Sequence, residues 1–520
     1  MDDNGKALCK AGDTLFEQKT HVLQLWEELA QNFYPTGGGF TTEFQWGRDY
    51  AANLFDSYPL LIARELSNTV GAVTRPMGRL WFGSGVNRDV TPSEADALSV
   101  MTEIHYDVQN DRSTGIERVK RQTDADIAVF GNCATYTRPS PDRSHPISIA
   151  CHLRDIAWQD GMNGEADRVH YKMHMDAVSA FKFFGKDAKL HHDIKEAADK
   201  HKDTKFEFRH VMMPVEDYEY YKKPPKKGAY VSVFYDVKHK MIVAEQSADF
   251  LRYSIGRWNR VAGSQYGYSP ASLIALPDAR TLQQIGYILL TAGERVVDPP
   301  MVATDQATKS GIDLLPGGIT YIDRDYDERT GNPIRPIEMG KGLPYGFEIK
   351  ADARSMLTEA FFLNKLKLPD GTAKTAYETQ ELVQEYMRSS APVFEPLQVD
   401  YNARMLETEF NTLVELDTFG DILPPSLGGE EVKFTFSNEL QDSLSRSEAM
   451  RFSDLSQLLA TSIQLDQSLP SQVEVVKGFR EAVKSIGAEK WLVEEDQVQQ
   501  PQMPPEMMQA LAQGADELAA

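Results

Sequence analysis

The chain has 520 residues, of which 77 are acidic and 55 are lysine or arginine, so its formal net charge is −22 at pH 7. One hydrophobic core rarely serves a chain of this length, and a composition with 41% hydrophobic and 25% charged residues argues against wholesale disorder and against collagen-like or disulfide-scaffold classes. The negative charge argues against a free-standing basic nucleic-acid binder, because the overall field repels phosphate, but it is compatible with a protein that surrounds DNA without gripping it.

The first 130 residues carry apolar side chains at helical spacing, which predicts a series of amphipathic helices. Proline and glycine follow the first helix, and Gly131 with Asn132 supplies a left-handed stop after the last. The predicted helices cover about residues 13–33, 58–73, 92–110 and 116–130.

Between residues 133 and 260 the apolar pattern changes to one typical of β-strands. A hairpin is predicted where residues 231–235 turn back into residues 241–243, and a short helix is predicted at about 175–184. We therefore predict an α+β fold that is mainly α, with an α+β module over the first 275 residues.

Two long helices are predicted next. The first covers 277–297, because Pro277 suits the first turn of a helix and Asp278 suits its electropositive end. At about 1.5 Å per residue this helix would span roughly 30 Å. A stretch rich in glycine, proline and aspartate follows over 299–345, and the second helix covers 350–364. We expect the two helices to pack through Leu282, Ile285, Leu289, Met356 and Ala360.

The rest of the chain is also predicted to be largely helical. Thr375 and Glu378 match a capping box, so a helix should begin there, and Pro392 and Pro396 should kink or break it. From about residue 496 the chain is acidic and rich in Gln and Pro, and we expect this tail to be poorly ordered alone. The positions predicted to be buried after the prolines are Leu406, Phe410, Leu413 and Val414.

Neither the cysteines nor the N-terminal residues indicate a disulfide framework, a thiolate metal site or a secretion signal. Cys9, Cys133 and Cys151 are too few and too scattered for a disulfide framework, and no CxxC pair indicates a thiolate zinc site. We expect free thiols in a reducing cytosol. The acidic residues 1–4 argue against a secretion signal, and the longest apolar run, 285–290, is too short to cross a bilayer, so we expect no membrane partner.

Motifs for catalysis or cofactor binding are weak. Residues 340–342 lack the flanking residues of a phosphate-binding loop, and Pro270 stands where a nucleophile elbow must continue its turn. His170 and His174 are spaced so that two imidazoles could share a metal on a helix, and they share a face on a strand, but a third ligand is missing. We interpret them as ordinary packing or surface histidines, and we assign no catalytic residue, metal or cofactor.

Three charged segments have a similarly plain interpretation. Residues 323–328 resemble the start of a calcium loop, but Glu328 stands where that loop needs glycine, so a solvated acidic loop is favoured. The basic clusters at 118–121 and 222–227 could touch phosphate, although solvated charge is the simpler interpretation in an acidic chain. A long chain without a catalytic constellation favours a structural or channel role.

Residues 258–271 read WNRVAGSQYGYSPA, and residues 275–278 read ALPD. This stretch resembles a motif of the portal proteins of short-tailed bacteriophages, also called head-to-tail connectors, which reads approximately W-x-R-x-x-G-E-x-Y-G-R-x-P and then A-L-P-D before a long helix. Gln265 and Tyr268 stand where the family has an acidic residue and an arginine. The matching residues are Trp258, Arg260, Gly263, Tyr266, Gly267, Pro270, Pro277 and Asp278.

Weaker resemblances to the same family occur in the same order over about residues 15–420. They imply a portal fold with wing, stem, clip and crown regions that assembles as a ring. On this sequence the regions would be an N-terminal wing at 1–275, stem helices at 276–298 and 346–364, a clip at 299–345, a channel loop at 365–375, a long wing helix at 376–440, a helical crown at 441–495 and a C-terminal tail at 496–520.

The resemblance also implies a function and a set of partners. Twelve copies would form a ring at one capsid vertex, contact capsid and scaffolding proteins, dock a terminase motor and later tail adaptor proteins, and pass double-stranded DNA without sequence specificity. The protein would lack catalytic activity, belong to the virion and assemble in the host cytoplasm. Lys365, Lys367 and Lys374 bracket the channel loop and would either make transient phosphate contacts or only solubilise the turn.

Two other functions remain open. A cytoplasmic hydrolase that uses a carboxylate pair would need a closed pocket with two convergent acids of raised pKa. A different virion ring, such as a tail adaptor, would lack an antiparallel helix pair at 277–297 and 350–364.

Overall fold

A computed structural model describes much of the chain, which divides by its internal contacts into one unit at Met1–Phe436 and a second at Ser437–Ala520. Among the described helices, none has both the length and the apolar character that crossing a membrane requires. The described residues are 3–42, 45, 47, 49–76, 78, 80–88, 90–185, 188–200, 204–220, 228–297, 301–303, 334–336, 343–363, 392–427, 432–436, 452–453, 455–456, 458 and 475–485.

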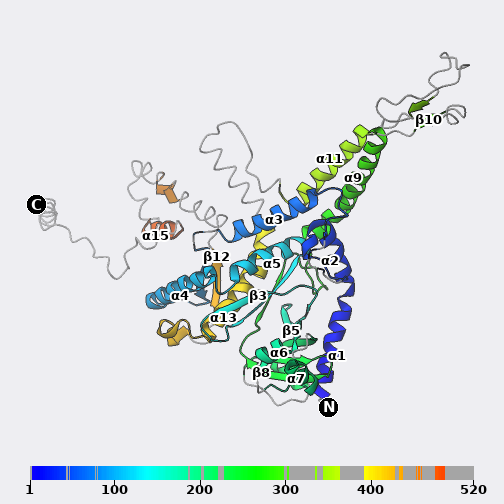
Figure 1. Ribbon diagram of the computed structural model, residues 1–520. Coiled ribbons are helices and arrows are strands. Elements are labelled where there is room, and N and C mark those ends of the chain that lie inside the picture. Colours follow the sequence, from blue (N-terminus) through cyan, green and yellow to red (C-terminus); the bar gives the residue numbers. More distant parts are fainter. Residues whose placement is uncertain are drawn as a thin grey trace, which may run out of the picture. The chain divides into compact units, whose positions relative to one another are not determined.

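The first unit begins with two helices, α1 (Asp3–Gln18) and α2 (Thr20–Phe33) (Figure 1). The sequence predicts one helix over 13–33, whereas the helical region begins earlier and is interrupted at Lys19. The Lys19 side chain is fully buried, and its ammonium donates to two backbone carbonyl oxygens of the core. The interruption is therefore associated with an inward-pointing lysine that the helical pattern does not reveal.

The next three helices agree with the predicted ranges. The second of them begins with a capping box, in which the Thr91 side chain accepts from the N–H of Glu94 and the Glu94 carboxylate accepts from the N–H of Thr91. The third ends at Gly131, whose φ of 70° is left-handed, as the sequence predicts. These helices are α3 (Tyr58–Thr74), α4 (Pro92–Asn110) and α5 (Ile116–Phe130).

Two antiparallel sheets follow. One has the strand order β3-β2-β9 and the other β4-β5-β6-β7-β8, and the β7–β8 hairpin is the one that the sequence predicts. The strands of the first sheet are β2 (Asn132–Pro139), β3 (Pro146–Ala150) and β9 (Tyr253–Arg257). Those of the second are β4 (Ile156–Asp160), β5 (Ala166–Asp176), β6 (Lys205–Pro214), β7 (Tyr230–Asp236) and β8 (Met241–Ala248).

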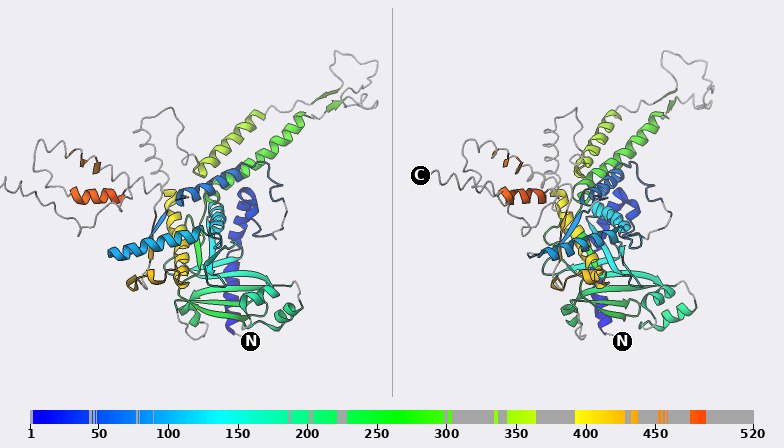
Figure 2. Two further views of the ribbon diagram at one scale, coloured as in Figure 1. Left: turned by 60° about the vertical axis from the view of Figure 1, so that its left-hand side comes forward. Right: turned by 90° about the vertical axis from the view of Figure 1, so that its left-hand side faces the viewer.

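Helices cover both faces of the five-stranded sheet. Side chains alternate along β6, so Val211 packs against Leu8 of α1, while Phe208 belongs to the opposite core with Ala180 and Ile194. The helices on that opposite face, α6 and α7, lie beside the sheet in the turned views (Figure 2). The short helices of this module are α6 (Ala177–Phe184), α7 (His192–Asp199) and α8 (Val215–Tyr220).

The two long predicted helices are present as α9 (Leu276–Val297) and α11 (Leu343–Ala360), and they lie side by side in each view (Figures 1 and 2). A π-helical turn, Ala271–Ala275, leads directly into α9. Pro277 therefore follows a helical turn instead of opening the helix, and α11 begins earlier than the predicted residue 350. Two short strands beyond the pair, β10 (Met301–Ala303) and β11 (Ile334–Pro336), are antiparallel.

The last part of the first unit is also helical, but one strand interrupts the range 376–440 that the sequence assigns to a long helix. Residues 392–397 are helical and continue into a π-helical turn, so the helix does not end at Pro396, and Pro392 is the first described residue of this helix. Val414 is 39% exposed, which makes its predicted burial wrong, whereas the other three predicted side chains are buried. The elements are a π-helical segment Gln398–Ala403, α13 (Arg404–Glu415) and β12 (Val432–Phe436), which pairs with β1 (Phe82–Val86).

In the second unit, α15 (Val475–Ser485) is a helix within the range that the sequence predicts to be helical.

Candidate functional site at the base of the paired helices

The segment that precedes α9 is joined to the end of α5 by close backbone contacts. The side-chain amide of Asn132 donates to the carbonyl oxygen of Gly267, and its side-chain oxygen accepts the N–H of Gly267, both at 2.8 Å. A Cβ on Gly131 would lie 2.4 Å from the backbone nitrogen of Ser269, and a Cβ on Gly267 would lie 2.7 Å from the carbonyl oxygen of Gly131. Glycine at both positions therefore allows the two backbone segments to approach this closely.

Aromatic rings and a buried lysine hold the same segment. The ring of Tyr266 packs against Trp26 of α2 and Trp158 of β4, with centroid distances of 5.6 and 4.6 Å. The Lys19 ammonium lies 4.9 Å from the centroid of Trp26 and 5.6 Å from that of Tyr266, within cation–π range. Burial lowers the pKa of Lys19 well below its ordinary value, because leaving water disfavours the charged form.

The other residues of the motif divide between core and surface. Trp258 and Pro270 are buried, whereas Pro277 is exposed. Gly263 has a φ of 84° with open space around the position of a Cβ, and Arg260 donates to a backbone carbonyl oxygen in the β4–β5 turn. The motif therefore contains buried residues that pack against the core and an exposed loop between them.

The base of α9 has one buried side. Ala279 and Leu282 are fully buried, and Asp278 is half-buried in the first turn. On another side, Arg280 forms a two-point ion pair with Glu28 of α2, with Nε–Oε1 at 2.5 Å and the second contact at 2.7 Å. These contacts fix α9 to the N-terminal helices.

A glycine allows close packing between α9 and α11. A Cβ on Gly346 would lie 2.7 Å from Cδ2 of Leu289 and 3.9 Å from Cδ1 of Ile285. Because this contact places the start of α11 beside the outer half of α9, the two helices are antiparallel. Ala360 is buried, and Met356 is 48% exposed.

Asp56, in the loop before α3, connects both helices. The side chain of Gln283 in α9 donates to the Asp56 carbonyl oxygen at 2.8 Å and accepts the Asp56 N–H at 3.0 Å. The Asp56 carboxylate, 2% exposed, accepts from Lys350 and Arg354 of α11, both at 2.8 Å. Burial alone raises the pKa of Asp56, but the hydrogen bonds from Lys350, the Tyr58 backbone and Arg354 outweigh it, so its pKa is lowered.

Large apolar side chains on both helices are exposed. Leu290 of α9 is 56% exposed and Phe347 of α11 is 59% exposed. Exposed apolar side chains that gather in this way are typical of surfaces that bind proteins, membranes or ligands. The remaining exposed apolar side chains of the pair are Tyr287, Ile288, Val296, Val297 and Tyr345.

Arg75, at the end of α3, holds the π-helical segment against α5. Its guanidinium donates to the carboxylate of Asp124 and, at 2.6 Å, to the side-chain oxygen of Asn402. The Tyr401 hydroxyl donates to Asp124 at 2.9 Å and lies 2.7 Å from the hydroxyl of Thr123. This buried ion pair is supported by further hydrogen bonds, the condition under which buried charge is tolerated.

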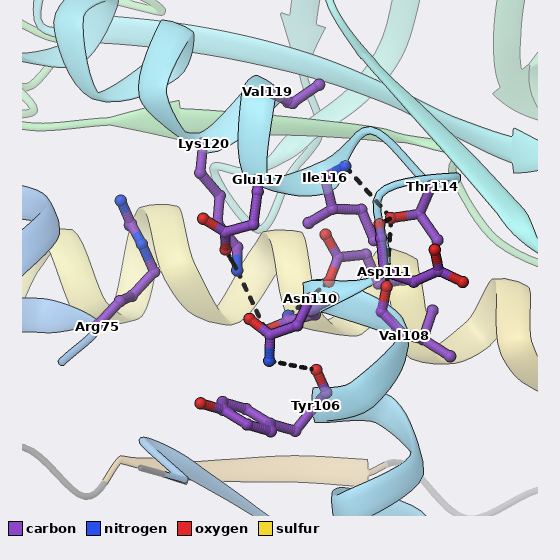
Figure 3. A network of polar contacts seen from close by, with 12 residues as sticks. Arg75, Tyr106, Val108, Asn110, Asp111, Thr114, Ile116, Glu117, Val119 and Lys120 are labelled. Carbon is purple, nitrogen blue, oxygen red and sulfur yellow. Dashed lines mark hydrogen bonds and ion pairs between the residues drawn. The ribbon is translucent and has the colours of Figure 1, made fainter. Parts of the chain in front are cut away.

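A second buried polar network joins α4, α5 and α13. Glu409, 1% exposed, accepts from the side chain of Gln109 at 2.7 Å and lies 3.2 Å from Nε2 of His105. Lys120 donates to Gln109 at 3.3 Å and to Glu117 at 2.8 Å. Figure 3 shows Lys120 and Glu117 of α5 side by side, next to the last residues of α4. The network therefore ties the α4–α5 corner to α13.

A cavity of about 240 Å³ bears on the hydrolase alternative. Asp167 and Asp400 line it, and burial raises the pKa of both carboxyl groups. However, the Tyr230 hydroxyl donates to Asp167 at 3.1 Å, and Arg260 lies 4.0 Å from Asp400. Because both carboxyl groups have polar neighbours, these contacts favour a structural polar network over a catalytic pair of acids.

The two predicted candidate histidines lie on β5. His170 is fully buried and His174 is exposed. Four steps along a strand separate them by roughly 13 Å, at about 3.3 Å per residue. They are therefore too far apart to share a metal, which agrees with their interpretation as ordinary packing and surface histidines.

The predicted channel-loop and capping residues, Lys365, Lys367, Lys374, Thr375 and Glu378, lie outside the described residues, and their roles stay predictions. Sequence reasoning missed the contacts between Asp56 and the helix pair. No spacing rule could find these contacts, because the hydrogen bonds of Asp56 to Gln283 and Arg354 span 227 and 298 residues.

Comparison with known proteins gives a family match over most of the chain. A family model described as bacteriophage head to tail connecting protein matches residues 6–493. A curated relative, a probable portal protein of Bordetella phage BPP-1, is 27% identical over 221 residues, which is 42% of this chain. The match spans 39% of the length of that relative.

Two solved structures of gene transfer agent particles are also similar. One is the neck of an empty particle, at 10% identity, and the other is the virion of the native particle, at 11% identity. In both cases the similarity covers 79% of this chain and 90% of the other chain, with a TM-score of 0.38.

Proposed function

Because the chain belongs to the family of bacteriophage head-to-tail connecting proteins, we propose that it forms a portal, a closed ring of twelve copies at one capsid vertex through which double-stranded DNA enters and leaves. The structural observation that carries the proposal is the α9–α11 pair: two antiparallel helices fixed at their base and exposing apolar side chains along their length. In this proposal the pair is the stem.

Ring closure accounts for the exposed apolar side chains. In a ring, one surface of each copy docks on a different surface of the next, and the contact closes when the rotation between copies does. Leu290 and Phe347 would then be buried by neighbouring copies, and Met356 would pack between copies instead of within one chain. The contacts of Asp56 with Gln283, Lys350 and Arg354, here called the Asp56 clamp, would keep every stem at the same angle, which a closed ring requires.

The charge of the chain supports a sliding channel. A wall that bound many phosphates would halt the duplex, because each neutralised phosphate adds affinity. The net charge of −22 opposes such binding. Lys365, Lys367 and Lys374 would supply only transient contacts, and the protein itself would have no catalytic activity, since ATP hydrolysis would belong to the motor.

The proposed partners follow from the position of the ring at one capsid vertex. The clip, between α9 and α11, would dock a terminase motor during packaging and tail adaptor proteins afterwards. The wing would face capsid and scaffolding proteins. The ring would assemble in the host cytoplasm and remain in the virion.

Particle mass and electron microscopy of the purified full-length protein test the ring. We expect a twelve-subunit mass and particles with a central hole. A variant with Leu290→Asp and Phe347→Asp should keep the fold of the single chain, since both side chains are exposed, but should fail to form rings.

Met162→Asp is the matched control, because Met162 is a fully exposed apolar side chain in the β4–β5 turn. It should assemble as the wild type does. A wild type that stays monomeric at all concentrations, or a double variant that assembles normally, would contradict the proposal.

A further inference from the structure

Two histidines and an aspartate converge where α7 meets the turn between β7 and β8. His191 caps the start of α7, Asp193 lies in its first turn, and His239 lies in the β-turn. One ligand atom from each of the three lies within 4.8 Å of the others. Asp193 Oδ2 is 3.2 Å from Nε2 of His239, and Asp193 Oδ1 is 3.5 Å from Nδ1 of His191.

The separation of 3.2 Å between Asp193 and His239 is close to that in a transition-metal site, whereas the three ligand atoms together lie within 4.8 Å and would draw closer around an ion. Bonds of about 2.0–2.1 Å in a tetrahedral zinc site place neighbouring ligand atoms about 3.3–3.5 Å apart. The two imidazole rings are stacked, with centroids 3.7 Å apart and planes 13° from parallel. The lone pairs of stacked rings lie in nearly parallel planes, and His191 Nδ1 accepts the N–H of Asp193 at 3.3 Å, so the His191 ring, which is 38% exposed, must turn out of the stack to share an ion.

The surroundings of His239 point to a cation more directly. Its Nδ1 lies 2.5 Å from Oδ2 of Asp236, a fully buried carboxylate at the end of β7. Its Nε2 faces a second carboxylate, that of Asp193. A neutral imidazole donates only one proton, so it satisfies one of these carboxylates and turns a lone pair towards the other. Either a second proton on the ring or a metal cation between Nε2 and Asp193 removes that conflict, and zinc titration distinguishes the two.

The pair of Asp236 and His239 is the arrangement that metal sites use to orient a histidine. A carboxylate that accepts the Nδ1 proton fixes the tautomer and leaves the Nε2 lone pair for the metal. Backbone hydrogen bonds hold that carboxylate in turn, since its Oδ1 accepts from the N–H of Lys238 at 3.0 Å and of His239 at 3.4 Å. The orienting group is thus part of the turn itself.

We propose that His191, Asp193 and His239 bind one divalent transition-metal ion, with zinc as the expected occupant, oriented by Asp236. Two imidazoles and a carboxylate are ligands that suit zinc. The ion would fasten α7 to the β7–β8 turn and so hold the α6–α7 layer on the five-stranded sheet. The proposal is independent of the ring, because all four residues belong to one chain.

The test is zinc titration of chelator-treated full-length protein by calorimetry, with Co²⁺ absorption as a second readout of the ligand geometry. The wild type should bind one Zn²⁺ per chain and melt at a higher temperature with it. His239→Ala and Asp193→Asn should each lose the saturable site. Asp193→Asn is the milder change, because Asp193 is half exposed at the start of a helix.

Asp236→Asn is the sharpest variant. Its retained oxygen can still accept the turn N–H groups, while its new amide would donate to Nδ1 of His239, move the proton to Nε2 and weaken binding about 10–100-fold. His174→Ala, which removes an exposed histidine elsewhere in the same module, should bind as the wild type does.

Two results would overturn the site. One is a wild type with no saturable Zn²⁺ binding, and NMR that finds His239 doubly protonated at neutral pH would then show that a proton bridges the two carboxylates. The other is zinc binding that persists unchanged in His239→Ala with the fold intact by circular dichroism.

Discussion

The guanidinium of Arg354 donates to the carboxylate of Asp56 at 2.8 Å, across 298 residues of sequence. The same carboxylate accepts from Lys350, and the Asp56 backbone pairs with Gln283 of α9. One short loop before α3 therefore fixes the base of both long helices.

Asp56→Asn should weaken this clamp. The variant keeps the size of the side chain but removes the negative charge that two cations share, and Lys350 and Arg354 are partly exposed, so we expect a loss of about 1–3 kcal/mol in the free energy of unfolding. Chemical denaturation measures it. Glu28→Gln, which breaks the exposed pair with Arg280, should cost less than about 1 kcal/mol. Equal losses in the two variants would contradict the clamp.

Buried histidines should make the fold sensitive to acid. Burial lowers the pKa of His170 and of His210 to about 3, against about 6.5 in an unfolded chain. Below pH 6.5 the unfolded chain takes up these protons and the folded chain does not, so the stability they contribute is present above pH 6.5 and is lost as the pH falls towards 3. The contribution of each histidine to the free energy of unfolding should fall by about 2 kcal/mol between pH 7 and pH 5.

Denaturant titrations at pH 7 and pH 5 measure this loss. His170→Leu should reduce the difference between the two pH values by about 2 kcal/mol, whereas His174→Leu, at an exposed position on the same strand, should leave it unchanged. The prediction fails if both variants keep the pH dependence of the wild type.

Gly131→Ala should be markedly more destabilising than Gly263→Ala. Both glycines have positive φ, at 70° and 84°, so alanine at either should cost about 1–2 kcal/mol in backbone energy. A Cβ at Gly131 would also lie 2.4 Å from Ser269, whereas Gly263 has open space, so overpacking should add about 1–3 kcal/mol at Gly131 alone. Thermal denaturation of the two variants compares them directly.

Leu282→Asp should prevent folding of the helix pair. Leu282 is fully buried, and an unpaired carboxylate there costs several kcal/mol or remains protonated. We expect aggregated or proteolysed protein on expression. Leu290→Asp, on the same helix but exposed, should give a folded chain that limited proteolysis leaves intact, and similar damage from both changes would mean that the burial of Leu282 is not what matters.

The channel-loop lysines provide a test of the proposed DNA contact. Changing Lys365, Lys367 and Lys374 together to Ala should leave ring assembly intact and change the yield of packaged DNA, because transient phosphate contacts are lost. Packaging assays on particles that carry the variant measure this. An unchanged yield would mean that the three lysines only make the loop soluble and do not contact DNA.

Local patterns predicted much of the fold. The left-handed Gly131 gave the end of α5, and apolar spacing gave α3, α9 and the β7–β8 hairpin. The three cysteines are free, as their spacing indicated. The family was recognisable from residues 258–278, because its glycines, aromatics and prolines are clustered in sequence.

The sequence by itself thus determined many of the elements and the family they build, since capping, periodicity and turn chemistry act over a few residues. Only the tertiary structure decided that Lys19 interrupts the first helix, that Asp56 holds α9 and α11, and that His191 meets His239. Those outcomes depend on contacts between groups far apart along the chain, and burial and hydrogen-bond geometry select such contacts only once the whole chain has packed.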